Sequence, residues 1–430
     1  MLSLFGCCIE LIDVILFNNI YVHYVNQTRK MLINLFIRTG VFIVGAKRTP
    51  FCSYGGPFRE MPASHIFASA AKAAIISANV DPNAIDNIVV GNVNFLSQCD
   101  GGKTARYCGL YSGVPIHKPA LGVSKACGTG LQAIVTSALD ILTGSAKLSL
   151  TGGTENMSSL PLLVRNIRFG TSLGASYKLE EYITEQYLDS NVGLTLQQMA
   201  EEVAKSCGVS RDEADEFALQ SHLKWKAGYE NKVFDDEVVS VKAKTKKKEV
   251  LVAKDELPRT FITDEHLSCL PPVTGLSIVT EGNSSSPADG AAALLLASSE
   301  AVKQQNLLPL ARVAGWACVG TDPRDATGAV PAVRKLLEIM KMTVDDVDWF
   351  EINETFATAT LATARELRVE DKLNRHGGAL AVGHAPAATG ARMAVHLAHQ
   401  ISQKKVKRSI AASSCGGGQG VAIMLEHIKT

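Results

Sequence analysis

Residues 124–153 read SKACGTGLQAIVTSALDILTGSAKLSLTGG, and this stretch decides the fold class. It starts with a glycine turn that carries a cysteine. A helix with one apolar face is predicted over Gly130–Leu142, and a short apolar run predicts a strand over Lys147–Thr151 that ends in two glycines. A turn, helix and strand in this order are typical of α/β proteins, in which helices cover a sheet.

The same alternation runs along the chain from residue 41 onward. Apolar runs predict strands at Val41–Pro50, Ile88–Asn92, Ala291–Ala297, Trp349–Asn353, Ser409–Ser413 and Val421–Leu425. One-sided apolar patterns predict helices at Ser64–Ala78, Ala200–Ser206, Arg211–Tyr229, Ala332–Met340 and Gly390–Gln403. Mixed or parallel sheets covered by helices are therefore expected.

A second stretch of the chain is organised like the first. Residues Gly383–Gly390 form another glycine-flanked turn that enters a helix, and Ser414–Gly418 again follows a strand with a Gly-rich turn. Duplication of one α/β unit would explain this similarity. Between the two stretches, residues 156–275 are polar and helical and carry the lysine run Lys244–Lys248, which is more typical of a solvated face than of a ligand site.

Composition excludes several classes of protein. The 430 residues include 43 basic and 42 acidic side chains, so no net field favours nucleic acid or an anionic membrane. Ten cysteines are scattered without a CxxC pair or zinc-finger spacing, which predicts neither a metal site nor a disulfide framework. Free thiols of this kind indicate a reducing compartment.

The N-terminal residues 1–40 are interpreted as an extension or targeting leader. Their apolar run is interrupted by polar residues such as Glu10 and Asp13 and lacks a preceding basic residue, so neither a spanning helix nor a secretory signal is expected. From Met31 to Arg59 there is no acidic residue, and arginines are present. This pattern fits a mitochondrial address, with translation beginning at Met31.

Two residues at loop-to-helix junctions are candidates for chemistry. Cys127 lies on the glycine turn that opens a helix, where backbone N–H groups and the helix dipole favour a thiolate. A packed, inert cysteine is the alternative interpretation. His384 lies on the second turn and is a candidate base that would activate such a thiol.

Two further segments follow predicted strands. Cys415 precedes three glycines, whose N–H groups can approach a ligand as in an oxyanion hole, and it is a second candidate thiol. Asn353 ends the strand that begins at Trp349 and can hold a water or a carbonyl oxygen, while Glu354 can orient a neighbour. Alone, each of these patterns is weak.

Together, the four segments in this order resemble the motifs of the thiolase family. The similarity runs from about Val41 to the C-terminus, and the stretches Lys47–Phe51 and Val164–Gly170 resemble mitochondrial members that act in fatty-acid oxidation. The segments that carry the resemblance are Ala126–Ala133, Asn353–Ala357, Gly383–Gly390 and Cys415–Gly420.

The resemblance implies an α/β fold with a duplicated five-layered αβαβα core and an inserted, mainly helical loop domain. The implied N-terminal half covers residues 41–155 and is completed by about 276–305. The loop domain covers 156–275 and lies over the CoA site, and the C-terminal half covers 306–430. Thiolases are homodimers or homotetramers, so a homo-oligomer is also implied.

The implied reaction is thiolytic cleavage of 3-ketoacyl-CoA, with CoA as a co-substrate and no permanently bound cofactor. Cys127 would accept the acyl group, His384 would keep it ionised, and Cys415 would act as acid and base. A water on Asn353 would stabilise the enolate, and the N–H groups of Cys127 and Gly417 would form the oxyanion hole. The implied CoA contacts are Arg259, Ser285 and Thr263.

The sequence departs from the family pattern just after His384. Ala385 replaces the usual proline, Pro386 follows, and Ala387 replaces a glycine, a change that could displace His384. An active enzyme is still expected. Two alternatives stay open: an acetoacetyl-CoA thiolase that runs the condensation, and a relative that is impaired by this turn and only binds CoA. Ketoacyl synthases share the fold, but Asn353 and Cys415 indicate a thiolase.

Overall fold

The computed structural model describes residues 40–97, 100–245 and 248–428. The predicted leader and the Met31 start fall outside these ranges. Residues from Val41 onward form one compact unit. None of the described helices is both long enough and apolar enough to cross a membrane.

A large mixed sheet is the centre of this unit. Its strands follow the order β14-β15-β16-β13-β1-β12-β5-β3-β4, with β2 paired to β12. The bounds are β1 Val41–Arg48, β2 Cys52–Ser53, β3 Asn87–Gly91, β4 Ala120–Val123, β5 Leu148–Glu155, β12 Ala288–Ser298, β13 Ala311–Gly320, β14 Trp349–Ile352, β15 Arg408–Cys415 and β16 Gln419–Glu426.

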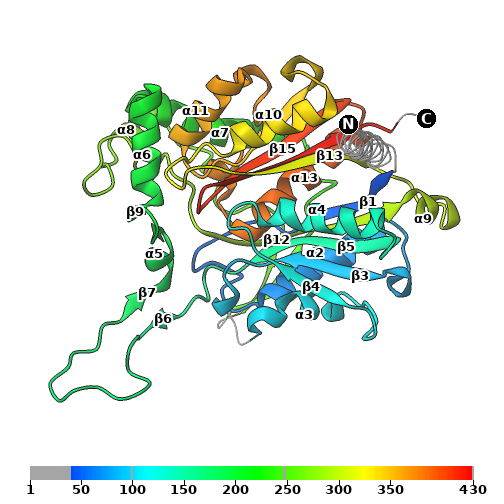
Figure 1. Ribbon diagram of the computed structural model, residues 1–430, viewed down its shortest axis with the longest axis horizontal. Helices are drawn as coiled ribbons and strands as arrows, with labels where there is room; N and C mark the ends of the chain where they lie inside the picture. Colours follow the sequence, from blue (N-terminus) through cyan, green and yellow to red (C-terminus); the bar gives the residue numbers. More distant parts are fainter. Residues whose placement is uncertain (1–39, 98–99, 246–247, 429–430) are drawn as a thin grey trace, which may run out of the picture. The chain divides into compact units, whose positions relative to one another are not determined.

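The sheet has two halves, and helices lie on the outer side of each half and between them. They therefore form three layers, as the core clusters and Figure 1 show. Helices α2 (Ala63–Ser77) and α3 (Thr104–Tyr111) pack on the half that contains β3 and β5. Helices α10 (Ala329–Met340) and α11 (Ala357–Leu367) pack on the half that contains β14–β16. Helices α4 (Thr129–Leu142) and α13 (Pro386–Ser402) lie between the halves. The predicted αβαβα layering is confirmed.

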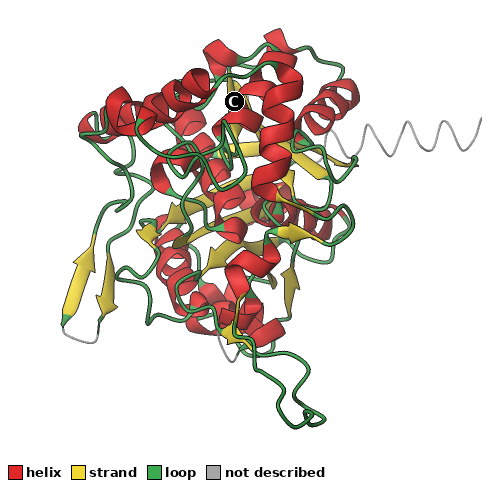
Figure 2. Cartoon of the chain, turned by 90° about the vertical axis from the view of Figure 1, so that its left-hand side faces the viewer, coloured by secondary structure: helices red, strands yellow, loops and turns green. Residues whose placement is uncertain are grey.

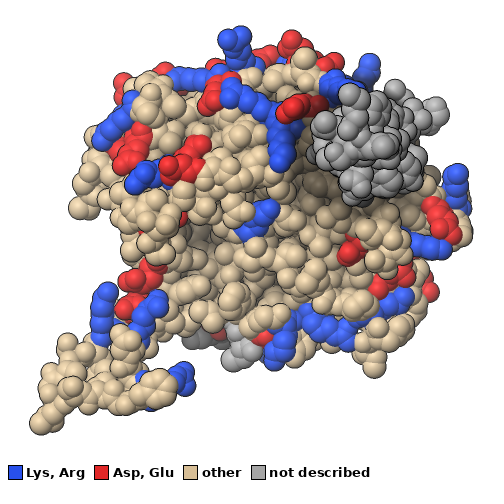
Figure 3. Space-filling model, viewed as in Figure 1, with Lys and Arg blue, Asp and Glu red and all other residues tan. Residues whose placement is uncertain are grey.

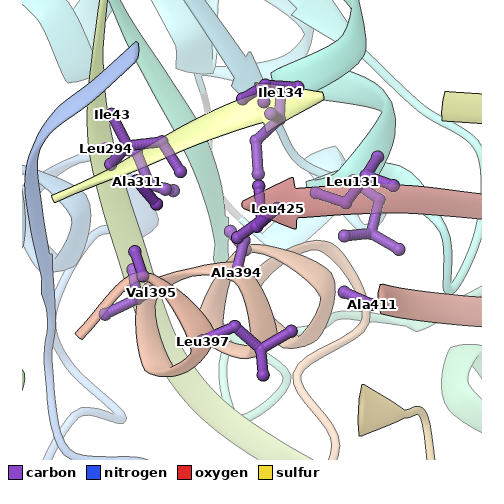
Figure 4. Close-up of a cluster of buried hydrophobic side chains, with 14 of the residues drawn as sticks. Ile43, Leu131, Ile134, Leu294, Ala311, Ala394, Val395, Leu397, Ala411 and Leu425 are labelled. Carbon is purple, nitrogen blue, oxygen red and sulfur yellow. The ribbon is translucent and has the colours of Figure 1, made fainter. Parts of the chain in front are cut away.

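The middle layer holds the central part of the core. In Figure 4, side chains from α4 and α13 meet those of the strands on either side, for example Ile134, Leu294, Val395 and Leu425. Strand β12 is buried over almost its whole length, because helices cover both of its faces. This explains why its sequence is a continuous apolar run rather than an alternating one.

The described residues of segment 156–275 contribute no strand to the large sheet. Its helices are α5 (Tyr182–Gln186), α6 (Leu196–Cys207), α7 (Arg211–Glu230) and α8 (Asp264–Ser268). Its short strands pair only with one another, as β6 (Leu162–Leu163) with β7 (Glu180–Glu181), β8 (Leu188–Asp189) with β9 (Leu194–Thr195), and β10 (Val241–Lys244) with β11 (Glu249–Val252). Figure 2 shows that the β10–β11 hairpin and the arm between β6 and β7 project from the body. The domain boundaries at 155, 275 and 305 stay predictions.

Most predicted elements are present within a few residues, but several observed elements were not predicted, among them β4, β13, α3 and α11. Strand β13 was not predicted because a register shift between Val313 and Gly315 disrupts its alternation of buried and exposed residues. Helix α11 was not predicted because it consists mainly of Ala and Thr, and α3 was not predicted because it is only 8 residues long; neither has a long aliphatic face. The short helices α9 (Ser299–Gln304) and α12 (Ala379–Val382) complete the fold.

Two glycines bring α4 and α13 into backbone contact. A Cβ atom on Gly130 would lie 2.5 Å from the backbone nitrogen of Ala391, and one on Gly390 would lie 2.8 Å from that of Leu131. Both glycines lie in the first two turns of their helices. The N-terminal ends of the two helices, and the turns that precede them, are therefore held side by side.

Candidate active site

The two turns at these helix ends border one cavity. It has a volume of about 670 Å³, and its lining includes Cys127, His384, Gly416 and Gly417. Arg259 and Ser285 also line it. A second cavity of about 50 Å³ is lined by Cys127, Asn353 and Cys415, among others. Thr263 lines neither cavity; it is exposed and caps the N-terminus of α8.

Cys127 is held between a strained residue and a glycine. Ala126 has a φ of 43°, an unusual conformation for an alanine and one that is concentrated at functional sites. Burial raises the pKa of the Cys127 thiol to about 11, although N–H donors, including that of Gly416, partly offset this effect. The expectation that the helix terminus would give a standing thiolate is therefore wrong, because desolvation outweighs these hydrogen bonds.

Cys415 packs directly against the turn of Cys127. A Cβ atom on Gly128 would lie 2.5 Å from the Cys415 sulfur, so only glycine lets the two cysteines approach this closely. Burial, and then the nearby Cys127, hold the pKa of the Cys415 thiol above its ordinary value. Gly128 therefore makes room for the second thiol.

His384 is fixed on both sides by backbone hydrogen bonds. Its N–H donates to the carbonyl of Ser286 at 2.8 Å, and its carbonyl accepts from the N–H of Ala288 at 3.2 Å. Pro386 is the first residue of α13, where its missing N–H costs no hydrogen bond, and Ala387 continues the helix without a positive φ. Neither Pro386 nor Ala387 therefore strains this turn.

The tautomer of His384 follows from its hydrogen bonds. The Thr389 hydroxyl donates to the carbonyl of Ala385 at 3.0 Å, so its oxygen accepts from His384 Nδ1 at 2.8 Å. The proton is therefore assigned to Nδ1. Nε2 is left as a buried acceptor without a hydrogen-bond partner in the described part of the chain. Burial lowers the pKa of His384 to about 4, so the imidazole is neutral at pH 7.

A buried carboxylate that sequence reasoning missed supports this turn. Glu155, at the end of β5, accepts from the N–H of Ala387 at 3.1 Å and from the N–H of Asn94 at 2.9 Å. Burial raises the pKa of Glu155 to about 7. The only sequence signal was a carboxylate after two glycines at a strand end. Glu155 thus ties the first turn of α13 to the loop after β3.

Side-chain hydrogen bonds also fix the segment Asn353–Thr355. Asn353 Nδ2 donates to Thr355 Oγ1 at 3.1 Å, and Asn353 Oδ1 is buried without a hydrogen-bond partner among the described residues. The predicted orienting role of Glu354 has a structural basis, because its carboxylate accepts from Ser221 Oγ and Asn374 Nδ2, both at 2.7 Å. It links helix α7 of the inserted segment to the core.

Arg259 and Ser285, which line the main cavity, are both held in place by hydrogen bonds. Arg259 is positioned through its backbone N–H, which donates to His222 Nδ1 at 3.1 Å. Ser285 donates through both its N–H and its hydroxyl to the carbonyl of Thr355, which joins the cavity wall to the Asn353 segment. Among the described residues, no group of His, Cys, Asp or Glu side chains is arranged to hold a metal ion.

Comparison with known proteins identifies the family. The model of the thiolase N-terminal domain matches residues 41–300, and that of the C-terminal domain matches residues 307–427. The chain belongs to the thiolase family and is an acyltransferase.

Several members of the family are similar over most of their length. The chain is 40% identical to human "3-ketoacyl-CoA thiolase, mitochondrial" over 390 residues, which are 90% of this chain and 98% of the relative. It is 37% identical to a "Probable acetyl-CoA acyltransferase" of Staphylococcus aureus over 91% of this chain and all of the relative. The crystal structure of human mitochondrial 3-ketoacyl-CoA thiolase in complex with CoA matches with a TM-score of 0.87 at 40% identity, over 91% of this chain and 98% of that chain.

Burial of Cys127 predicts a characteristic pH dependence of its alkylation. Because the thiolate is the reactive form and its pKa is about 11, labelling of Cys127 by iodoacetamide will be slow at pH 7 and will accelerate up to about pH 11. The exposed thiols of Cys207 and Cys269 serve as internal references. Peptide mass spectrometry measures each rate, and a Cys127 rate that levels off below pH 8 would contradict the assignment.

Proposed function

We propose that the protein cleaves 3-ketoacyl-CoA with CoA to give acetyl-CoA and a shortened acyl-CoA, the last step of β-oxidation. The observation that carries this proposal is the convergence of Cys127, Cys415 and a neutral His384 on adjoining cavities. The close relatives named as 3-ketoacyl-CoA thiolases support it.

In the first step, His384 Nε2 removes the proton of the Cys127 thiol, and the thiolate attacks the C3 carbonyl. The bond between C2 and C3 then breaks, Cys127 keeps the acyl group as a thioester, and the electron pair forms the enolate of acetyl-CoA. Cys415 donates its proton to C2 of that enolate. A neutral imidazole with a free Nε2 can accept this proton; because the pKa of Cys127 lies above that of His384, the transfer belongs to the complex with substrate.

In the second step, Cys415 takes the proton of the incoming CoA thiol. The CoA thiolate attacks the acyl-Cys127 thioester, and Cys127 leaves as a thiolate that takes its proton back from His384. The N–H groups of Cys127 and Gly417 are assigned to the oxyanion, and a water on Asn353 Oδ1 to the enolate oxygen. Arg259 and Ser285 are assigned to CoA, since both line the main cavity; Thr263 is withdrawn from this set because it lies at the cap of α8.

We also propose that the protein is a homo-oligomer of the mitochondrial matrix. The arm between β6 and β7 exposes Phe169 to 99% and Leu173 fully, and Figure 3 shows few charges on it. Exposed apolar residues of this kind are typical of interfaces. Light scattering that gives the mass of a single chain would contradict the oligomer. Cell fractionation that finds the protein outside mitochondria would contradict the location.

The first test is cleavage of acetoacetyl-CoA and 3-ketopalmitoyl-CoA by the purified protein. Replacement Cys127→Ala removes the nucleophile, so CoA-dependent cleavage is expected to fall by at least about 10³-fold. Cys207→Ala is the matched control because Cys207 is exposed and lines neither cavity. The proposal fails if wild-type protein that binds CoA cleaves neither substrate.

The hydroxyl of Thr389 is predicted to set the working tautomer of His384. In Thr389→Val the acceptor for Nδ1–H is lost, so kcat is expected to fall about 10²-fold, whereas Thr389→Ser keeps the hydroxyl and most of the activity. Since the pKa of His384 is about 4, the acid limb of kcat/KM in the wild type should lie well below pH 6.5. Equal rates for the valine and serine variants would refute this role.

A further inference from the structure

Arg259, which is assigned to CoA, lies in a segment that contains neither helix nor strand. This segment joins β11, which ends at Val252, to α8, which begins at Asp264. Arg259 lines the main cavity, and no carboxylate of the described residues pairs with its guanidinium. Its charge can therefore bind an anionic group, and on the proposed function that group is a phosphate of CoA.

Hydrogen bonds anchor both ends of the stretch 255–259. At one end, the buried carboxylate of Asp255 accepts from both terminal guanidinium nitrogens of Arg48, at 2.6 and 2.9 Å. At the other end, the backbone N–H of Arg259 donates to His222 Nδ1 at 3.1 Å. Burial, and then the charge of Arg259, lower the pKa of His222 to about 4, so its ring is neutral at pH 7 and can accept this hydrogen bond.

Between these two anchors, Leu257 packs against the turn that carries His384. A Cβ atom on Gly383 would lie 2.3 Å from Leu257 Cδ1, so only a glycine admits this contact. Leu257 also packs against the apolar cluster to which Ala385 belongs. The stretch that presents Arg259 to the cavity is therefore in contact with the residue directly before His384, and it adjoins the cluster that holds the residue directly after it.

We propose that Leu257 is a positioning residue that couples the binding of a CoA phosphate at Arg259 to the placement of His384. This inference rests on the proposed function. A phosphate held by Arg259 fixes the stretch 255–259, and Leu257 passes this constraint to the turn of the base. A displacement of about 1 Å at a reacting centre can cost a hundredfold in rate, so the remote phosphates raise kcat and not only the affinity for substrate.

The test compares kcat for two substrate pairs, acetoacetyl-CoA with CoA and acetoacetyl-pantetheine with pantetheine. The second pair has the same reacting groups but carries no phosphate. The wild type is expected to have a kcat at least about tenfold higher with the CoA pair. In Leu257→Ala the contact with Gly383 is lost. The kcat for the CoA pair should then fall at least about fivefold, whereas that for the pantetheine pair should stay within about twofold of the wild type.

The matched control is Leu251→Ala, because Leu251 is exposed on β11 and lines neither cavity. It should leave both kcat values unchanged. If the role of Leu257 is merely structural, Leu257→Ala will lower both kcat values in the same proportion, and that result overturns the inference. Equal kcat values for the two pairs in the wild type overturn it as well.

Two variants of His222 keep the test decisive if Leu257→Ala does not fold. His222→Leu removes the acceptor for the N–H of Arg259, so the kcat advantage of the CoA pair should fall at least about threefold. His222→Gln keeps an acceptor and should keep most of that advantage. Equal advantages in the two variants overturn the inference. Absence of any cleavage by the wild type overturns the proposed function itself, and this inference with it.

Discussion

The backbone contact between α4 and α13 is the constraint on which the site depends. Gly130 and Gly390 remove the side chains that would otherwise hold the two helices apart. Each helix begins directly after a turn, and these turns carry Cys127 and His384. A side chain at either glycine would separate the helix ends, and a displacement of about 1 Å at a reacting centre can cost a hundredfold in rate.

Buried carboxylates hold the loops around this contact. Glu155 fastens the first turn of α13 to the loop after β3, and Glu354 fastens the Asn353 segment to α7. Each accepts hydrogen bonds from several donors, which offset part of the cost of burying a charge; at Glu155 burial still raises the pKa to about 7. These anchors explain how the turn after His384 tolerates Ala385 and Ala387: its position is set by neighbouring segments as well as by its own sequence.

The resting site is electrically neutral at the groups assigned to proton transfer. Burial raises the pKa of both thiols and lowers that of His384. An isolated thiolate or imidazolium would be poorly solvated there. Charge separation therefore belongs to the complex with substrate, where the oxyanion donors and the transferred proton compensate one another.

The sequence by itself located most of the elements and supplied the candidate residues of the site. Apolar periodicity is local, so it located most strands and helices, and the residue types in four motifs pointed to Cys127, His384, Cys415 and Asn353. Only the tertiary structure decided which of these residues share a cavity, that Gly128 makes room for Cys415, and that Thr263 caps a helix instead of lining the site. The physical reason is that burial, pKa and cavity shape arise between segments that are hundreds of residues apart in the chain.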